Sequence, residues 1–191
     1  MISYHSDRII VNDWGDCMSD LIPLTKKCQF DADIHQKYRA SACGPVTAYA
    51  LLDFHMPGRF SNIDALYRQL GSTPIGLFTY RFIRNLQKLL GKDWLVAKCS
   101  VNEMKRQITL GQPVAAKFDK WFSCQWFGHF SFDYHWVAVV GYEDTEKGLL
   151  LYVDDHGGPN RPSVTRIVPY ESNRKIITFI QITKISPPTQ W

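Results

Sequence analysis

A cysteine, a histidine and an acidic pair stand at the ends of expected helices and strands, where their side chains could act together. Cys43 directly precedes an apolar helical segment, and His135 opens an apolar strand. Asp154 and Asp155 end the next strand. A thiol becomes a nucleophile when its thiolate is stabilised, and the positive end of a helix and a nearby imidazole both do this. This arrangement predicts a Cys-His pair that is oriented by a carboxylate.

A side-chain amide upstream of the cysteine adds a fourth polar group. Gln36 precedes Cys43 by seven positions and could help the backbone N–H of the cysteine to hold an oxyanion. The acidic pair also fits an ordinary polar turn, and either Asp155 or Asp154 could be the orienting acid. The order Gln, Cys, His, Asp favours catalysis, because four unrelated structural roles would otherwise have to coincide.

The segment before the histidine is unusually aromatic. Residues 121–136 read WFSCQWFGHFSFDYHW, and Trp126 and Trp136 are candidates for the wall of a substrate cleft. The alternative is that these rings only fix a long insertion to the sheet.

Neither a metal nor a cofactor is expected. His129, Asp133 and His135 match no common zinc motif, and Gly157-Gly158 lacks the residues of a phosphate-binding loop. The five cysteines are widely spaced and contain no CxxC pair, which is atypical of a disulfide framework.

Periodicity and end signals predict helices in the first part of the chain. Residues 1–35 are expected to be irregular, with at most a short strand near 8–11. Helices are expected over 41–56, 62–70, 77–90 and 100–111, with capping residues or glycines at their ends. The helix after Cys43 is apolar around almost its whole circumference, so it should run through the middle of the molecule.

The pattern then changes to strands. These are expected over 113–118, 135–142, 148–154, 163–168 and 175–182, with a hairpin around the turn at 143–147. Helices followed by strands predict an α+β fold. The length of 191 residues fits a single domain over 1–191.

Bulk composition excludes several classes of protein. The chain has 22 basic and 18 acidic residues, and its basic residues are scattered, so a nucleic-acid partner is not expected. It contains no apolar run long enough for a membrane span, and its start lacks a signal-peptide pattern. A cytoplasmic location is the resulting expectation.

Several motifs together resemble the double-glycine leader (bacteriocin-processing) peptidases, a family of papain-like cysteine peptidases, and their stand-alone relatives. The resemblance covers about residues 34–156. It is carried by Gln36, Ala42-Cys43-Gly44-Pro45, Gly111-Gln-Pro-Val114, His135-Trp-Val-Ala-Val-Val-Gly-Tyr142 and Tyr152-Val-Asp-Asp155.

The resemblance implies a papain-like fold, with a helical N-terminal part followed by an antiparallel sheet, and a peptide or protein substrate. It assigns Cys43 as nucleophile, His135 as base, Asp155 as orienting acid and Gln36 to the oxyanion hole. This sequence departs from the family in having His156 where proline usually follows the acid, and in a Gln-to-Cys spacing that is one residue longer. The expected activity is hydrolysis of peptide bonds; acyl transfer through the same acyl-enzyme, or binding without catalysis, are the alternatives.

Overall fold

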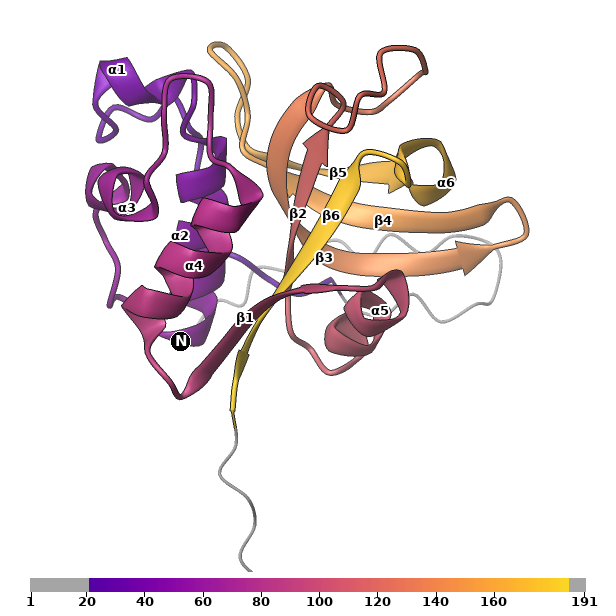
Figure 1. Ribbon diagram of the computed structural model, residues 1–191, viewed down its shortest axis with the longest axis horizontal. Helices are drawn as coiled ribbons and strands as arrows, with labels where there is room; N and C mark the ends of the chain where they lie inside the picture. Colours follow the sequence, from indigo (N-terminus) through magenta and orange to yellow (C-terminus); the bar gives the residue numbers. More distant parts are fainter. Residues whose placement is uncertain (1–20, 186–191) are drawn as a thin grey trace, which may run out of the picture.

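The computed structural model describes residues 21–185, which form a layer of helices packed on a six-stranded antiparallel sheet (Figure 1). The strand expected near residues 8–11 lies outside the described residues. The elements are α1 (Gln36–Arg39), α2 (Cys43–His55), α3 (Ile63–Leu70), α4 (Thr79–Leu90), β1 (Trp94–Cys99), α5 (Val101–Thr109), β2 (Val114–Asp119), β3 (Tyr134–Thr145), β4 (Gly148–Asp155), β5 (Val164–Pro169), α6 (Tyr170–Asn173) and β6 (Ile177–Lys184). The α+β class expected from the sequence is therefore present.

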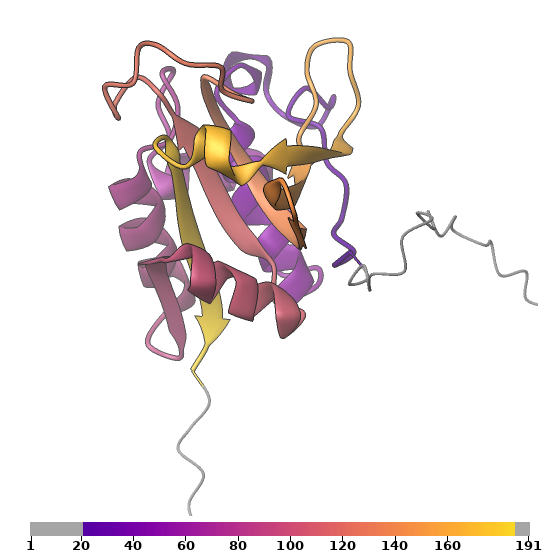
Figure 2. The ribbon, with the colours of Figure 1, turned by 90° about the vertical axis from the view of Figure 1, so that its right-hand side faces the viewer.

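Helix α2 occupies the centre of the molecule. It packs against α3 on one side and against β3 and β2 on the other, and nine of its 13 residues are buried. This explains why its apolar residues are not confined to one face. Helix α5 lies on the far side of the sheet from α2 (Figure 2). Truncating a fully buried α2 side chain such as Leu51 to alanine should cost about 2–5 kcal/mol of stability.

The strands follow the order β1-β6-β2-β3-β4-β5. The β3–β4 hairpin closes where Thr145 pairs with Gly148, and its register shifts between Val139 and Gly141. This hairpin was expected from the alternating apolar pattern on either side of a polar turn. It brings the start of β3 and the end of β4 to the same edge of the sheet.

Strand β1 precedes the last long helix and was not foreseen, because strands were expected only after Gly111. Its outer edge is covered by α4, whose Gln87 side chain donates to the carbonyl of Trp94 at 2.8 Å and accepts from the Val96 amide at 2.9 Å. These contacts replace those of a neighbouring strand.

The start of α2 approaches its neighbours closely at Gly44. A Cβ atom at this position would lie 2.9 Å from Leu77 Cβ and 3.3 Å from Trp136 Cδ1. Only glycine leaves room for this contact, so Gly44 helps to set the distance between the Cys43 end of α2 and strand β3.

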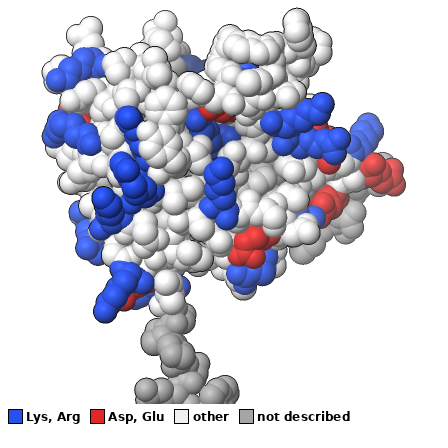
Figure 3. Space-filling view, in the orientation of Figure 1, with Lys and Arg blue, Asp and Glu red and all other residues white. Residues whose placement is uncertain are grey.

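Basic side chains do not form one continuous area on the face shown in Figure 3. Lysines and arginines there occupy separate patches with uncharged surface between them. Across residues 21–185, no helix combines the length and the apolarity needed to cross a membrane.

Candidate active site

Cys43 is the first residue of α2 and is buried. Ala42 precedes it and offers no side-chain cap, so the thiol shares this end of the helix with backbone N–H groups that have no capping side chain. Burial alone would raise the pKa of the Cys43 thiol. The hydrogen bond and the charge of His135, together with the amides of Trp136 and Gly44, outweigh burial and lower the pKa.

His135 stands at the start of β3, between the thiol and a buried carboxylate. Its Nε2 atom lies 3.0 Å from Oδ1 of Asp155, whose side chain is fully buried. Burial would lower the pKa of His135, but its interactions with Asp155 and Cys43 raise it to about 9. Since Nε2 faces the carboxylate, Nδ1 is the ring nitrogen left for the thiol.

Asp155 and Asp154 point to opposite faces of β4, as alternation along a strand requires. Asp154 contacts Lys26 and accepts from Thr165 Oγ1 at 2.8 Å. Burial would raise the pKa of Asp155, but His135 and two arginines hold this pKa well below its usual range. Of the two candidate acids, Asp155 is the one next to the imidazole.

The thiol and the imidazole open onto a small cavity. Its volume is about 150 Å³. One side is formed by Ala40 and Ser41, just before α2, and the other by the turn at residues 74–76. The remaining lining residues are Gln29, Cys43, Tyr134 and His135.

The structure brings Gln29, and not Gln36, to this cavity. Gln36 begins the short helix α1, where it is exposed, and it does not line the cavity. Gln29 is 8% exposed, and its Nε2 donates to the Arg39 carbonyl at 3.1 Å. Its backbone amide also donates to the carbonyl of His156 at 3.0 Å, which ties this segment to the end of β4. Gln29 lies in an irregular stretch, so no periodic pattern pointed to it.

Neither tryptophan expected in the cleft wall lies there. Trp136 is fully buried; its ring stacks on Phe82 at 4.5 Å, and its Nε1 donates to the Leu77 carbonyl at 3.0 Å. Alternation along β3 places Trp136 on the opposite face from His135. Trp126 is 58% exposed and packs edge-on against Trp121 in the loop between β2 and β3.

Other aromatic residues of the same segment do surround the site. The ring of Phe132 lies 5.0 Å from the ring of His135 and 5.0 Å from that of Phe118. Tyr134 lines the cavity and donates to the Leu77 carbonyl at 3.0 Å. The aromatic residues of the segment 121–136 therefore include rings that contact the site, such as Phe132, and exposed rings such as Trp126.

His156, which replaces the usual proline of the resembled family, is buried beside the site. Its Nε2 atom lies 2.7 Å from Thr47 Oγ1 in α2. Burial and the charge of His135 lower the pKa of His156 to about 3. His156 is thus a neutral ring that joins the end of β4 to α2.

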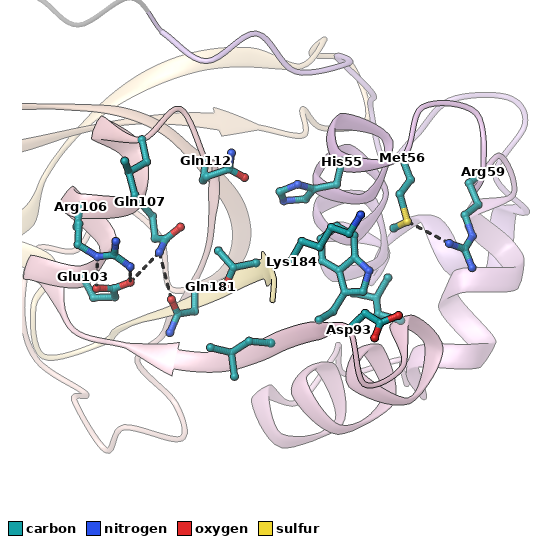
Figure 4. Close-up of a pocket in the computed structure, with 15 residues that line it drawn as sticks. His55, Met56, Arg59, Asp93, Glu103, Arg106, Gln107, Gln112, Gln181 and Lys184 are labelled. Carbon is teal, nitrogen blue, oxygen red and sulfur yellow. Dashed lines mark hydrogen bonds and ion pairs between the residues drawn. The ribbon is translucent and has the colours of Figure 1, made fainter. Parts of the chain in front are cut away.

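A larger, partly open cavity lies elsewhere. Its volume is about 1040 Å³, and it lies near the C-terminal end of α2, where His55, Gln107, Gln112 and Gln181 line it (Figure 4). Cys43 stands at the other end of the same helix, so size alone does not identify the reactive site. Within residues 21–185, no cluster of three or more His, Cys, Asp or Glu side chains could hold a metal ion.

Comparisons with known proteins found similarity among solved structures. No family model and no curated protein matches the sequence. Among solved structures, the chain is similar to a double glycine motif protease from an AMS/PCAT transporter, which was crystallised in complex with the leader peptide. The TM-score is 0.48 at 14% identity, over 85% of this chain and 94% of that chain.

Proposed function

We propose that the protein is a cysteine peptidase-like thiol hydrolase that uses Cys43, His135 and Asp155. The observation that carries the proposal is the single contact network from the start of α2 to the end of β4. In it, the imidazole interacts with both the Cys43 thiol and the Asp155 carboxylate. The lowered pKa of the thiol and the raised pKa of the imidazole favour a thiolate–imidazolium pair.

In this pair, Nδ1 of His135 holds the proton of the Cys43 thiol before the substrate reacts. The thiolate attacks a carbonyl carbon, and the electron pair of the C=O bond moves to the oxygen. His135 then protonates the departing amine, which leaves a thioester on Cys43. Water gives a proton to His135 and attacks this thioester, releasing the acid and restoring the thiol.

The developing oxyanion needs hydrogen-bond donors. The backbone N–H of Cys43 is one, and we assign the second to Nε2 of Gln29, because Gln29 lines the cavity and Gln36 does not. Nε2 has two hydrogens and gives one to Arg39, so the other is available to a bound substrate. Peptide bonds are the proposed substrates, in keeping with the motif resemblance.

The proposal is tested by trapping the thioester. The protein is mixed with an activated peptide ester, quenched in acid and digested, and the acyl group is located by mass spectrometry. The expected result is acylation of Cys43 that is lost in Cys43→Ala and strongly slowed in His135→Ala, whereas Cys124→Ala behaves as wild type. Adding a primary amine separates hydrolysis from acyl transfer through the amide formed. Acylation spread evenly over the cysteines, or none at all, would overturn the proposal.

A further inference from the structure

We propose that Arg161 and Arg166 are positioning residues for the active-site acid: both bind Oδ2 of Asp155, which leaves Oδ1 facing His135. This inference rests on the proposed thiol chemistry of Cys43. It adds to that chemistry a clamp, formed by Arg161 and Arg166, that keeps Asp155 ionised and keeps its Oδ1 directed at His135.

The two arginines reach the carboxylate from different segments. Nη1 of Arg161, in the loop at residues 156–163, lies 2.6 Å from Oδ2, and Nη1 of Arg166, in β5, lies 3.2 Å from the same atom. The backbone amide of Gly157 donates to Oδ1 at 3.2 Å, beside His135. Each oxygen of Asp155 therefore has its own set of donors.

A buried carboxylate needs this support for two reasons. Transfer of an unpaired charge out of water is costly, so without compensation the group would take up a proton. The last torsion of an aspartate is also broad and roughly two-fold, so the carboxylate needs fixed donors to hold one orientation. The guanidinium groups bound to Oδ2 compensate the buried charge and fix the orientation of the carboxylate, because they are always charged and their hydrogen bonds are directional.

Arg166 has a second contact that Arg161 lacks. Its guanidinium carbon lies 5.0 Å from the centre of the Phe132 ring, and this ring in turn packs against His135. Arg166 thus links the acid to the aromatic ring that covers the base. We expect its replacement to disturb the site more than replacement of Arg161.

The charged and titratable groups around the acid come from every neighbouring element. Beside the two arginines, they are Cys43 from α2, His135 from β3, His156 after β4 and Lys26 from the segment before α1. Lys26 contacts Asp154 on the other face of β4. The arginines are therefore the cations in direct contact with Oδ2 of Asp155, within the described chain.

Loss of the clamp should move the pH at which the site becomes reactive. The pKa of Asp155 is held down by His135 and by both arginines, so removing the arginines raises it. Below that higher pKa, a protonated Asp155 no longer supports the imidazolium, and the Cys43 thiolate is lost. The acid limb of the profile, in which the rate of Cys43 alkylation falls as pH decreases, should therefore shift to higher pH. The shift should be about one pH unit when both arginines are replaced.

The test is the rate of Cys43 alkylation by iodoacetamide between pH 4 and 9, followed by peptide mass spectrometry. Arg161→Gln and Arg166→Gln should each shift the acid limb upward, and the double variant should shift it most. Arg161→Lys should recover at least half of the Arg161→Gln shift, since it retains the charge. Arg174→Gln is the matched control, because Arg174 pairs with Glu171 at the surface, away from Asp155.

The possible outcomes separate this inference from the proposed function. If wild-type Cys43 reacts like Cys124 at every pH, and His135→Ala changes nothing, the thiol chemistry itself is wrong. If wild type shows an acid-shifted, His135-dependent thiolate but the arginine variants keep its pH profile, only the clamp is wrong. If the arginine variants melt at lower temperature but keep the wild-type pH profile of Cys43 alkylation, the arginines only stabilise the loop, and the clamp is again wrong. Should the double variant not fold, Arg161→Gln decides, because its half-exposed side chain lies in a surface loop.

Discussion

At the scale of single residues, Asp154 and Asp155 have the same chemistry and opposite environments. Asp155 is buried with His135 and two arginines on one face of β4, whereas Asp154 meets Lys26 and Thr165 on the other. Both carboxylates are buried, and their side-chain directions, not their type, separate a candidate orienting acid from a carboxylate paired with Lys26.

Paired substitutions should separate the two carboxylates. Asp155→Asn removes the charge that supports the His135 imidazolium, so alkylation of Cys43 at pH 6 should slow by about ten-fold or more. Asp154→Asn should leave that rate within two-fold, because the Asp154 side chain contacts Lys26 and Thr165 on the other face of β4. Equal rates in the two variants would remove Asp155 from the proposed site.

A second pair of variants addresses the oxyanion donor. Gln29→Ala should lower the rate of thioester formation by about 10²-fold, the usual effect of losing one such donor. Alkylation of Cys43 should be much less affected, because no oxyanion forms in that reaction. Gln36→Ala is the control and should behave as wild type, since its side chain is exposed. The reverse pattern would return the role to Gln36.

The candidate site residues proposed from sequence lie at the ends of regular elements. Cys43 begins a helix, His135 lies at the start of a strand and Asp155 ends one. Periodicity indicated these element ends, whereas the preference for Asp155 over Asp154 came from the family resemblance. Gln29 lies in an irregular segment, and its approach to the cavity depends on tertiary contacts with Arg39 and His156. Trp136, one candidate for the cleft wall, is instead buried on the face opposite His135, as alternation along the strand that starts at Tyr134 requires.

At the scale of elements, the helices and strands with clear end signals formed where they were expected. Asn62 and Ser100 cap α3 and α5 through their side chains, and Gly71 ends α3 in the left-handed conformation. The missed strand β1 lies among helices in the first part of the chain, and pairing with β6, far along the chain, defines it. Such a long-range partner leaves no local signal.

The close approach of α2 to its neighbours gives a prediction for this element. Gly44→Ala would gain about 0.5–1 kcal/mol of helix propensity, but the new Cβ would lie 2.9 Å from Leu77. Overpacking should prevail and destabilise the fold by about 1–3 kcal/mol in urea unfolding. Gly158→Ala is the control, because its Cβ would meet nothing closer than 3.9 Å. Equal stability of the two variants would show that α2 can move away from this contact.

At the scale of the whole molecule, one continuous core joins the helical layer to the sheet. Buried residues of α2, α3 and α4 belong to the same cluster as those of β2, β3 and β4. We therefore expect a single cooperative unfolding transition, in keeping with the one domain expected from the sequence.

Two histidines, the half-buried His135 and the buried His156, should make the stability of this unit depend on pH in opposite directions. The pKa of His156 is lowered to about 3, so its contribution is complete above the unfolded value of 6.5 and is lost as pH falls toward 3. The pKa of His135 is raised to about 9, so its own contribution is complete below 6.5 and is lost as pH rises through 9. The lowered pKa of Cys43 acts in the opposite direction on the alkaline side. The clear expectation is therefore a fall in the free energy of unfolding as pH decreases below 6.5.

Urea unfolding between pH 4.5 and 9 checks this dependence. His156→Asn should flatten the acid side, where each group contributes at most about 1.4 kcal/mol per pH unit. The exposed His129 supplies the control, His129→Asn, which should keep the wild-type curve. An acid side that His156→Asn leaves unchanged would mean that His156 is not held neutral by the fold.

The central claim, a Cys43–His135 pair supported by Asp155, is tested most directly by NMR titration of the His135 imidazole in protein with ¹³C-labelled histidine. His135 is expected to titrate with a pKa of about 9, because Asp155 and Cys43 stabilise its protonated form against the effect of burial. Cys43→Ala and Asp155→Asn should each bring this pKa down toward or below the ordinary 6.5. A wild-type His135 that titrates near 6.5 and does not respond to either substitution would contradict the account.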